Sequence, residues 1–445
     1  MNKLKNDLKK LRGFLILWIT QSFSALGSAM TAYALVIWSY ERQGSALRTS
    51  LLMVASYAPY VLLSIFAGAV SDKWDKKKTM LVCDSGAAVC TLVILGLLES
   101  GNLEIWHLYV VNAVNGLMNS IQQPASEVAT TCILPEEYYQ KVGGMRYFSN
   151  ALNSVLTPII ATAVMGFAGI RFIIWFDLCT FFTAFIILLF FLHIPKEKLS
   201  ENKKEESLFS LTKSGVAYLW NNKGILDLIL FLASINLVAS IYEAAFPAMI
   251  LSREGGSRMA LGVVNTVVGL TTLLGSVLAS FSKEPKSRIR VICNCLLLSM
   301  STENLILALG RSVPVWCIGA FLGWIAIPLM STNLDALLRL RIPVEIQGRV
   351  FAARNTLQFF TIPLGYFLGG FLVDYVFEPL LGRQAPHSVL SFLFGNGKGS
   401  GAAALFFVIA FAGVFICFYF RNFSHIWELE RDGKEPAGYP SIGKG

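Results

Sequence analysis

Long runs of apolar residues, separated by short polar or charged stretches, make up most of this chain. Each run has about the 20 residues that a helix needs to cross the roughly 30 Å hydrocarbon layer of a bilayer. Because lipid offers no hydrogen-bond partners, the backbone of such a run has to be helical. The pattern predicts an all-α integral membrane protein with twelve spans, near residues 13–40, 48–70, 78–99, 104–132, 143–168, 171–194, 224–250, 257–282, 289–310, 313–338, 349–377 and 402–421.

The composition agrees with a membrane protein. Hydrophobic residues account for 55% of the 445 residues and charged residues for only 15%, which is too little charge for a water-exposed surface. The eight cysteines form no C-x-x-C pair, so we expect packing residues and neither disulfides nor a metal site. The sequence contains no G-x-x-x-x-G-K-[ST] phosphate loop and no other enzyme signature. It therefore indicates no cofactor and no direct use of ATP.

Basic residues are distributed unequally between the two sets of loops. Of the 37 lysines and arginines, one side holds only Arg42, Arg48, Arg171, Arg253, Arg258, Arg311, Arg383 and Lys398. Loops rich in Lys and Arg stay in the cytoplasm, so we expect a multi-pass plasma-membrane protein with both termini cytoplasmic. The net charge of +9 then reflects topology and contact with anionic lipid, and not nucleic-acid binding.

The chain consists of two halves that repeat. Prolines, glycines and an asparagine recur at offsets between 204 and 208 residues, pairing Gly68 with Gly275, Pro124 with Pro328, Pro135 with Pro343, Asn150 with Asn355 and Pro158 with Pro363. Such constant offsets indicate a duplicated six-helix unit. We predict an N-terminal six-helix bundle at 1–194, a cytoplasmic connector with an amphipathic helix at 195–223, a C-terminal six-helix bundle at 224–421 and a cytoplasmic tail at 422–445.

The stretch between the second and third predicted spans combines a glycine, an acid and several lysines, which is typical of a cytoplasmic joint between moving helices. An acid at position 72 would favour contact with the N-terminus of the eleventh helix, where the helix dipole and an arginine both attract negative charge. The sequence therefore predicts a conformational gate made of Gly68, Asp72, Lys73, Lys76, Lys77, Gly348 and Arg349.

The same stretch resembles the loop between the second and third helices of the major facilitator superfamily, G-x-x-x-D-[RK]-x-x-[RK]-[RK]. The spacing of Trp18, Gln21, Ser24 and Gly27, together with the segments 124–125 and 343–351, is similar to the drug-efflux branch that includes macrolide-efflux proteins and, more distantly, the enterobactin exporter. The resemblance implies two pseudo-symmetric six-helix bundles that open a central site alternately to each side. It also implies that the fourth helix lines the central path.

A polar stripe runs along the fourth predicted span, where Asn112, Asn115, Asn119 and Gln122 share one helix face. Lipid disfavours such a face, so it should line a cavity or form hydrogen bonds between helices. The predicted cavity residues are Gln21, Ser24, Asn112, Asn115, Asn119, Gln122 and Trp324.

Acids inside the predicted spans are the remaining candidates, because an ionisable group in a membrane is costly. Asp84, Glu127 and Asp335 lie near cytoplasmic ends, where pairing with loop lysines and arginines is the simpler explanation. Asp177 lies near the outer end and is expected to be structural. Glu243 lies deeper, and we expect it to bind a proton or a cationic substrate; the alternative is a satisfied structural acid.

These features predict a secondary active transporter that exports small amphipathic drugs or secondary metabolites by alternating access, coupled to a proton or another ion. We expect it to act as a monomer. One alternative is uptake or facilitated diffusion of a small metabolite. A membrane receptor or scaffold is the alternative of another class, but it needs neither the repeat nor the gate motif.

Overall fold

The computed structural model describes residues 2–73, 75–133, 139–191, 208–343, 346–385 and 388–431, and within these ranges it is helical with no strand. The elements are α1 (Asn2–Gln43), α2 (Ala46–Lys73), α3 (Lys76–Glu99), α4 (Ile105–Ile133), α5 (Tyr139–Phe167), α6 (Gly169–Ile186), η2 (Ile187–Phe191), α7 (Leu208–Asn221), α8 (Lys223–Ser252), α9 (Arg258–Phe281), α10 (Arg288–Leu309), α11 (Val313–Trp324), α12 (Ile327–Arg341), α13 (Gln347–Phe359), α14 (Thr361–Phe371), η4 (Leu372–Phe377), α15 (Glu378–Gly382), α16 (Val389–Phe394), α17 (Ser400–Arg421) and α18 (Ser424–Arg431).

The predicted all-α membrane fold is confirmed. Within the described ranges, eleven helical segments are long and apolar enough to cross a membrane. The remaining predicted span is α4, whose 29 residues extend over about 44 Å at 1.5 Å per residue. Its stripe of asparagine and glutamine lowers the hydropathy of its described part, so α4 is identified by length and packing and not by composition.

Two of the predicted spans are interrupted helices. The tenth span is divided into α11 and α12 at Ile325 and Ala326, and the eleventh into α13 and α14 at Phe360. A proline, Pro328 or Pro363, follows each break by two or three residues. Because proline cannot donate a backbone hydrogen bond, it frees a carbonyl in the turn before it and breaks the helix there.

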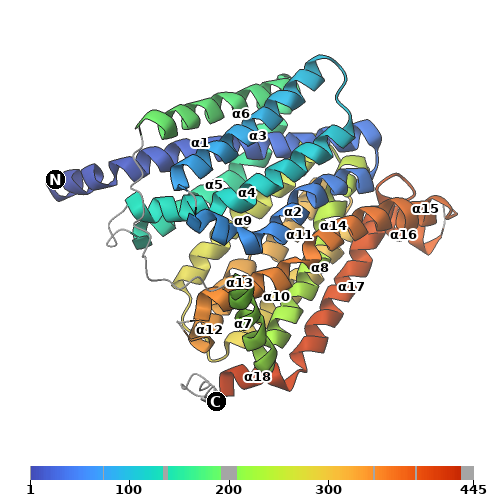
Figure 1. Ribbon diagram of the computed structural model, residues 1–445. Coiled ribbons are helices and arrows are strands. Elements are labelled where there is room, and N and C mark those ends of the chain that lie inside the picture. The colour runs from blue at the N-terminus through green and yellow to red at the C-terminus, as the bar shows by residue number, and fades with distance from the viewer. Residues whose placement is uncertain are drawn as a thin grey trace.

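The helices form two bundles, α1–α6 and α8–α17, which diverge in Figure 1 from the end that carries α15 and α16. This end holds residues 44–45, which connect α1 to α2, and we call it the opposite end because it lies opposite the basic end of the molecule. The basic end holds the start of α3 at Lys76 and the loop at 282–287. The main contacts between the bundles are α5 against α9 and α2 against α14.

Glycines allow the two bundles to approach closely. A Cβ at Gly269 of α9 would lie 2.9 Å from the carbonyl oxygen of Ser154 in α5, and one at Gly370 of α14 would lie 2.2 Å from Ser50 Oγ in α2. Real Cβ atoms do not approach so closely, so both contacts between the bundles require glycine at these positions.

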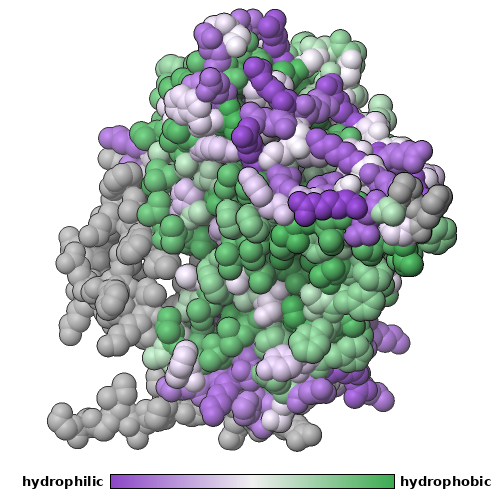
Figure 2. Space-filling model, turned by 90° about the vertical axis from the view of Figure 1, so that its right-hand side faces the viewer, coloured by the Kyte–Doolittle hydropathy of each residue, from purple (hydrophilic) through white to green (hydrophobic). Residues whose placement is uncertain are grey.

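The surface is consistent with a bilayer. Figure 2 shows a broad band of hydrophobic residues between zones of hydrophilic residues. Large apolar side chains such as Phe167, Phe281 and Phe415 are more than half exposed, which would be unfavourable in water and is expected next to lipid.

Two shorter helices lie outside the bundles' spans. Helix α7 occupies the place where the sequence predicts the amphipathic connector helix, and it contacts α13. Helix α18 contacts α8 and α10 at the basic end. There Glu430 accepts hydrogen bonds from Ser287 Oγ at 2.7 Å and from the backbone nitrogen of Ile289 at 2.8 Å, so it caps the N-terminus of α10.

Candidate functional site

Glu243 presents its carboxylate inside the helical assembly. It lies nine residues before the end of α8 at Ser252, which corresponds to a depth of about 14 Å. Its side chain is exposed, although the neighbouring Tyr242 and Ala244 are buried. Tyr366 of α14 donates a hydrogen bond to Glu243 Oε2 at 2.7 Å. The carboxylate is therefore held in position by one partner and remains accessible on its other side.

Pro247 disturbs the backbone hydrogen bonding of α8 beside this carboxylate. It lies inside α8, where its lack of an N–H leaves the carbonyl of the residue four positions earlier without its helical donor. That residue is Glu243. The helix is therefore locally weaker at the residue that carries the carboxylate.

Tyrosines connect Glu243 to the N-terminal bundle. Tyr57 of α2 meets the ring of Tyr366 edge-on, with ring centroids 6.1 Å apart and an interplanar angle of 88°. Tyr60, one turn further along α2, donates to Gln123 Oε1 of α4 at 2.8 Å. The site therefore combines an acid with aromatic rings from both bundles, which suits a cationic, partly apolar ligand.

A second acid, Glu303 of α10, lies next to this site, with Tyr242 and Glu243 of α8 as its titratable neighbours. Only 5% of its surface is exposed, and Trp324 Nε1 of α11 donates to Glu303 Oε1 at 2.8 Å. Tyr242 also lies within hydrogen-bonding reach of its carboxylate. The predicted cavity residue Trp324 thus positions a buried acid that sequence reasoning missed.

The N-terminal bundle has a polar cluster of its own. Asp84 of α3 accepts hydrogen bonds from Gln122 of α4 and Gln21 of α1. Two predicted cavity residues are therefore brought together on an acid. The interpretation of Asp84 as a partner of loop lysines is wrong, because amides from neighbouring helices satisfy it.

The other acids have different roles. Asp335 pairs with Arg354 at 3.7 Å, as expected for an acid near the basic end. Asp177 is buried and accepts from Ser28 Oγ at 2.9 Å, which agrees with a structural role. The side chain of Glu127 lies outside the described residues.

The asparagines of the α4 stripe differ in their surroundings. Asn119 is exposed, while Asn112 and Asn115 are half-buried. Asn112 Nδ2 donates to the carbonyl of Leu108 at 2.9 Å, and the buried Oδ1 of Asn115 has no hydrogen-bond partner within the described residues. Ser24, the remaining predicted cavity residue, is half-buried on α1.

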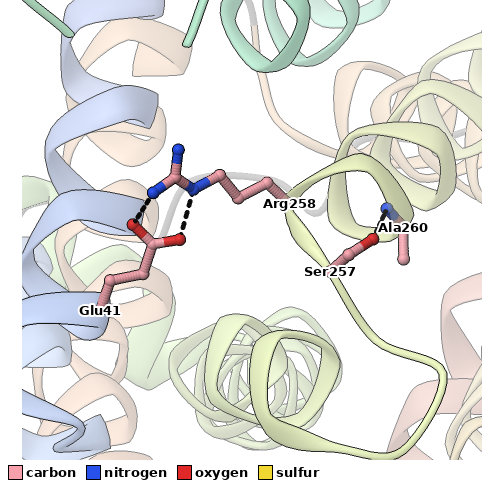
Figure 3. Close-up of polar contacts among 4 residues, drawn as sticks. All are labelled: Glu41, Ser257, Arg258 and Ala260. Atoms are coloured by element: carbon pink, nitrogen blue, oxygen red, sulfur yellow. Dashed lines mark hydrogen bonds and ion pairs between the residues drawn. The ribbon is translucent and has the colours of Figure 1, made fainter. Parts of the chain in front are cut away.

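At the opposite end, an ion pair joins the bundles. Arg258, the first residue of α9, donates through Nε and Nη2 to the two carboxylate oxygens of Glu41 in α1, with 2.6 Å for the Nη2 bond (Figure 3). Ser257 caps α9 by accepting from the backbone nitrogen of Ala260 at 3.0 Å (Figure 3), which fixes the start of the helix that carries Arg258.

A second acid links the bundles at the same end. Asp374, in η4, accepts hydrogen bonds from Ser45 Oγ at 2.6 Å and from the backbone nitrogens of Ala46 and Leu47 at 3.0 and 2.9 Å. A carboxylate of the C-terminal bundle therefore caps the N-terminus of α2, where the helix dipole favours negative charge. Tyr40 and Ser252 add a third link, at 2.5 Å between their hydroxyl oxygens.

The predicted gate at the basic end is described only in part. The surroundings of Gly68 and Gly348, and the side chains of Asp72, Lys73 and Arg349, lie outside the described residues. Lys76 is buried, and Lys77 Nζ donates to the carbonyl of Leu189 at 2.9 Å, a contact within the N-terminal bundle. Helix α2, which carries the motif, contacts α13, which begins at the predicted partner segment.

This architecture, with two helical bundles around a polar and aromatic centre in an apolar surface, defines a multi-pass membrane transporter and not an enzyme. The major facilitator superfamily matches residues 17–366, and the chain belongs to that family. Macrolide efflux protein A of Streptococcus pyogenes is 23% identical over 81% of this chain and 89% of its own length. Multidrug efflux pump Tap of Mycobacterium bovis is 21% identical over 81% and 87%.

Solved structures agree with this fold. The nucleoside transporter NupG superimposes with a TM-score of 0.67 at 12% identity, covering 92% of this chain and 98% of its own. A bacterial homologue of the lysosomal transporter Spinster superimposes with a TM-score of 0.63 at 12% identity, covering 95% and 97%.

Proposed function

We propose that this protein exports amphipathic drugs or secondary metabolites that carry a basic group, and that it exchanges them for protons. The observation that carries the proposal is the exposed Glu243 carboxylate, which Tyr366 holds by a hydrogen bond while Tyr57 meets the ring of Tyr366 edge-on. An acid beside aromatic rings matches the charge and the apolar body of such a cargo. The names of the relatives, macrolide efflux protein A and multidrug efflux pump Tap, support the same cargo class.

The proposed orientation places the basic end in the cytoplasm. The lysines and arginines at 73–78 and 283–290 favour that assignment, and both termini then lie inside. In the described structure, the Glu41–Arg258, Asp374–Leu47 and Tyr40–Ser252 contacts join the bundles on the outside. The conformation is therefore the one in which the outer side is closed, and rocking of the bundles would exchange it for the reverse state.

Proton exchange at this site follows from competition between a proton and a cation for negative charge. A carboxylate in a poorly solvated site is most stable when its charge is neutralised, by a proton or by a bound cation. Cargo that enters from the cytoplasm would displace the proton, and a proton from outside would displace the cargo. The predicted division at 1–194, 195–223, 224–421 and 422–445, and the monomeric state, remain predictions.

The test is drug accumulation in an efflux-deficient bacterium, with erythromycin as a macrolide that carries a basic amine. Expression of the protein should lower accumulation, a protonophore should abolish the difference, and a Glu243→Gln variant should behave like cells without the protein. Higher accumulation on expression would favour the alternative of uptake. Export that persists with the protonophore would contradict proton coupling.

A further inference from the structure

Glu303 occupies a site built for a carboxyl group. A Cβ on Gly323 of α11 would lie 2.5 Å from Glu303 Oε2 and 2.5 Å from its Cβ, so glycine at this position makes the room that the acid occupies. The adjacent Trp324 donates its indole N–H to the other carboxylate oxygen at 2.8 Å. Two successive residues of α11 thus accommodate and orient one buried acid.

Among the described residues, no basic side chain forms an ion pair with this acid. Helix α10 carries no other charged residue between Arg290 and its end, α11 carries none, and α17 carries only Arg421 at its last position. Asp335, Arg339 and Arg341 of α12 lie towards the basic end. The titratable groups that face Glu303 are Tyr242 and Glu243 of α8.

The buried arginine at the end of α8 has backbone partners. Arg253, which follows α8, donates to the carbonyl of Leu307 at 3.1 Å, one turn beyond Glu303. Burial lowers the pKa of Arg253 to about 10, and the guanidinium remains charged at neutral pH. Its contact with a backbone carbonyl ties the end of α8 to α10 and leaves Glu303 to its neutral donors.

The two acids differ in access. Glu243 is exposed, whereas Glu303 is 5% exposed and lies behind Tyr242, which is itself buried and stacked between Phe246 and Phe406 at 5.3 and 5.1 Å. Glu243 therefore offers accessible surface to a cargo, and Glu303 offers almost none. A proton needs no such surface, and the Tyr242 hydroxyl lies between the two sites.

Their charges are nevertheless coupled. The carboxylates of Glu243 and Glu303 are near enough to repel each other when both are ionised. Two carboxylates that share a poorly solvated site hold a proton between them, because full ionisation without a counter-cation is unfavourable. A cation bound at Glu243 removes that restriction.

We propose that Glu303 is a separate proton-binding site, and that cationic cargo arriving at Glu243 expels the proton from Glu303. The O–H bond of the Glu303 carboxylic acid breaks, the proton passes to water in the central space, and the remaining negative charge is balanced by the cargo's cation. The reverse step binds a proton at Glu303 and releases the cargo. This proposal rests on the proposed function. It assigns the cargo to Glu243 and the proton to Glu303.

The test measures proton release in lightly buffered detergent solution as erythromycin is added to the purified protein. The parent should release about one proton for each drug bound. Glu303→Gln should bind erythromycin with an affinity within about two-fold of the parent but release no proton, and Glu303→Asp should restore the release. Gly323→Ala, which displaces the Glu303 carboxylate, should also lose it. Gly96→Ala is the matched control, since a Cβ at Gly96 has no neighbour within 4 Å.

Infrared spectroscopy of the same samples separates the two proposals. The carbonyl stretch of a protonated carboxylic acid should be present in the parent, weaker in Glu303→Gln and restored in Glu303→Asp. If Glu303→Gln releases protons like the parent, or leaves this band unchanged, the Glu303 assignment is wrong. If the parent binds no erythromycin, the proposed cargo class is wrong and the infrared band alone decides whether Glu303 holds a proton.

Discussion

Arg258 of α9 holds the carboxylate of Glu41 of α1 with two nitrogens, so that a single residue from each bundle forms an ion pair at the opposite end. Both side chains are partly exposed, at 45% and 32%. Exposed ion pairs contribute about 0.2–1 kcal/mol, which is little for the stability of the whole protein. The same free energy is enough to shift the balance between two conformations of similar energy.

The first prediction concerns this ion pair. Glu41→Gln should make the outer side open more often, by up to about five-fold for about 1 kcal/mol. The measurement is the rate at which an impermeant thiol reagent modifies Asn265→Cys in a cysteine-free protein. Asn265 lies on α9 deeper in the protein than the ion pair, and its Nδ2 donates a hydrogen bond to the Tyr33 hydroxyl at 3.3 Å. The reversed pair, Glu41→Arg with Arg258→Glu, should restore the slow rate.

The control for this experiment is an ion pair that does not join the bundles. Glu99 and Arg171 are 3.5 Å apart and are both partly exposed in the N-terminal bundle. Glu99→Gln should leave the labelling rate at position 265 unchanged. An equal acceleration in both variants would show that the effect is not specific to closure.

The second prediction is that Asp374 contributes more to closure than the ion pair does. Asp374→Asn removes the charge that caps α2, an interaction of about 1–2 kcal/mol. Labelling at position 265 should accelerate about ten-fold, because about 1.4 kcal/mol corresponds to that factor. Glu378→Gln is the matched control, since Glu378 accepts from the backbone nitrogen of Gly399 at 2.8 Å within the C-terminal bundle. Equal rates in the two variants would contradict this role.

The third prediction concerns the gate motif at the basic end. Asp72→Asn should lose most transport while the protein remains inserted at the parent's level, because the charge that would face the N-terminus of α13 is removed. Asp75→Asn is a discriminating control, since Asp75 caps α3 through the backbone nitrogen of Lys78 at 3.0 Å. It should preserve transport and leave the melting temperature nearly unchanged, because asparagine caps a helix about as well as aspartate. Normal transport by Asp72→Asn would exclude the gate assignment.

The fourth prediction concerns the α4 stripe. A polar thiol reagent should modify Asn119→Cys faster than Asn112→Cys or Asn115→Cys, because Asn119 is exposed and the others are half-buried. Erythromycin should slow the reaction at all three positions if the stripe lines the cavity. Val111→Cys should stay unreactive, as Val111 is 7% exposed. Inert cysteines at all three stripe positions would favour the interpretation as helix packing.

The fold could be predicted from the sequence because lipid imposes one rule, that apolar runs become helices. The site was only partly predictable. Glu243 stood out by its depth, and the α4 stripe by its spacing. Glu303 and Asp374 also lie inside predicted spans, at 289–310 and 349–377, and so met the same criterion without being singled out. Their partners, Trp324 and the N-terminus of α2, could not be read from the sequence. These partners are far away in the chain, and only packing brings them close.

Asp84 illustrates the same limit from the opposite direction. Its position near a basic loop favoured a lysine partner, yet Gln122 and Gln21 satisfy it. Position along a helix gives the depth of a side chain but not the direction in which it points around the helix axis. The partner is decided by which neighbouring helix the side chain faces.

The fifth prediction is that Glu243→Gln separates movement of the cargo from its coupling to the proton gradient. Glutamine keeps the size of glutamate and can still accept the hydrogen bond that Tyr366 donates at 2.7 Å, but it can neither titrate nor balance a cation. In proteoliposomes, accumulation of erythromycin driven by a pH gradient should be abolished. Its affinity should fall about ten-fold, the loss of about 1.4 kcal/mol of charge interaction. Downhill exchange at saturating drug should continue, because the bundles can still rock.

Tyr366→Phe, which removes the donor and keeps the acid, should retain accumulation at a reduced rate. If Glu243→Gln accumulates erythromycin uphill like the parent and with the same pH dependence, then Glu243 is a structural acid and the coupling depends on another group.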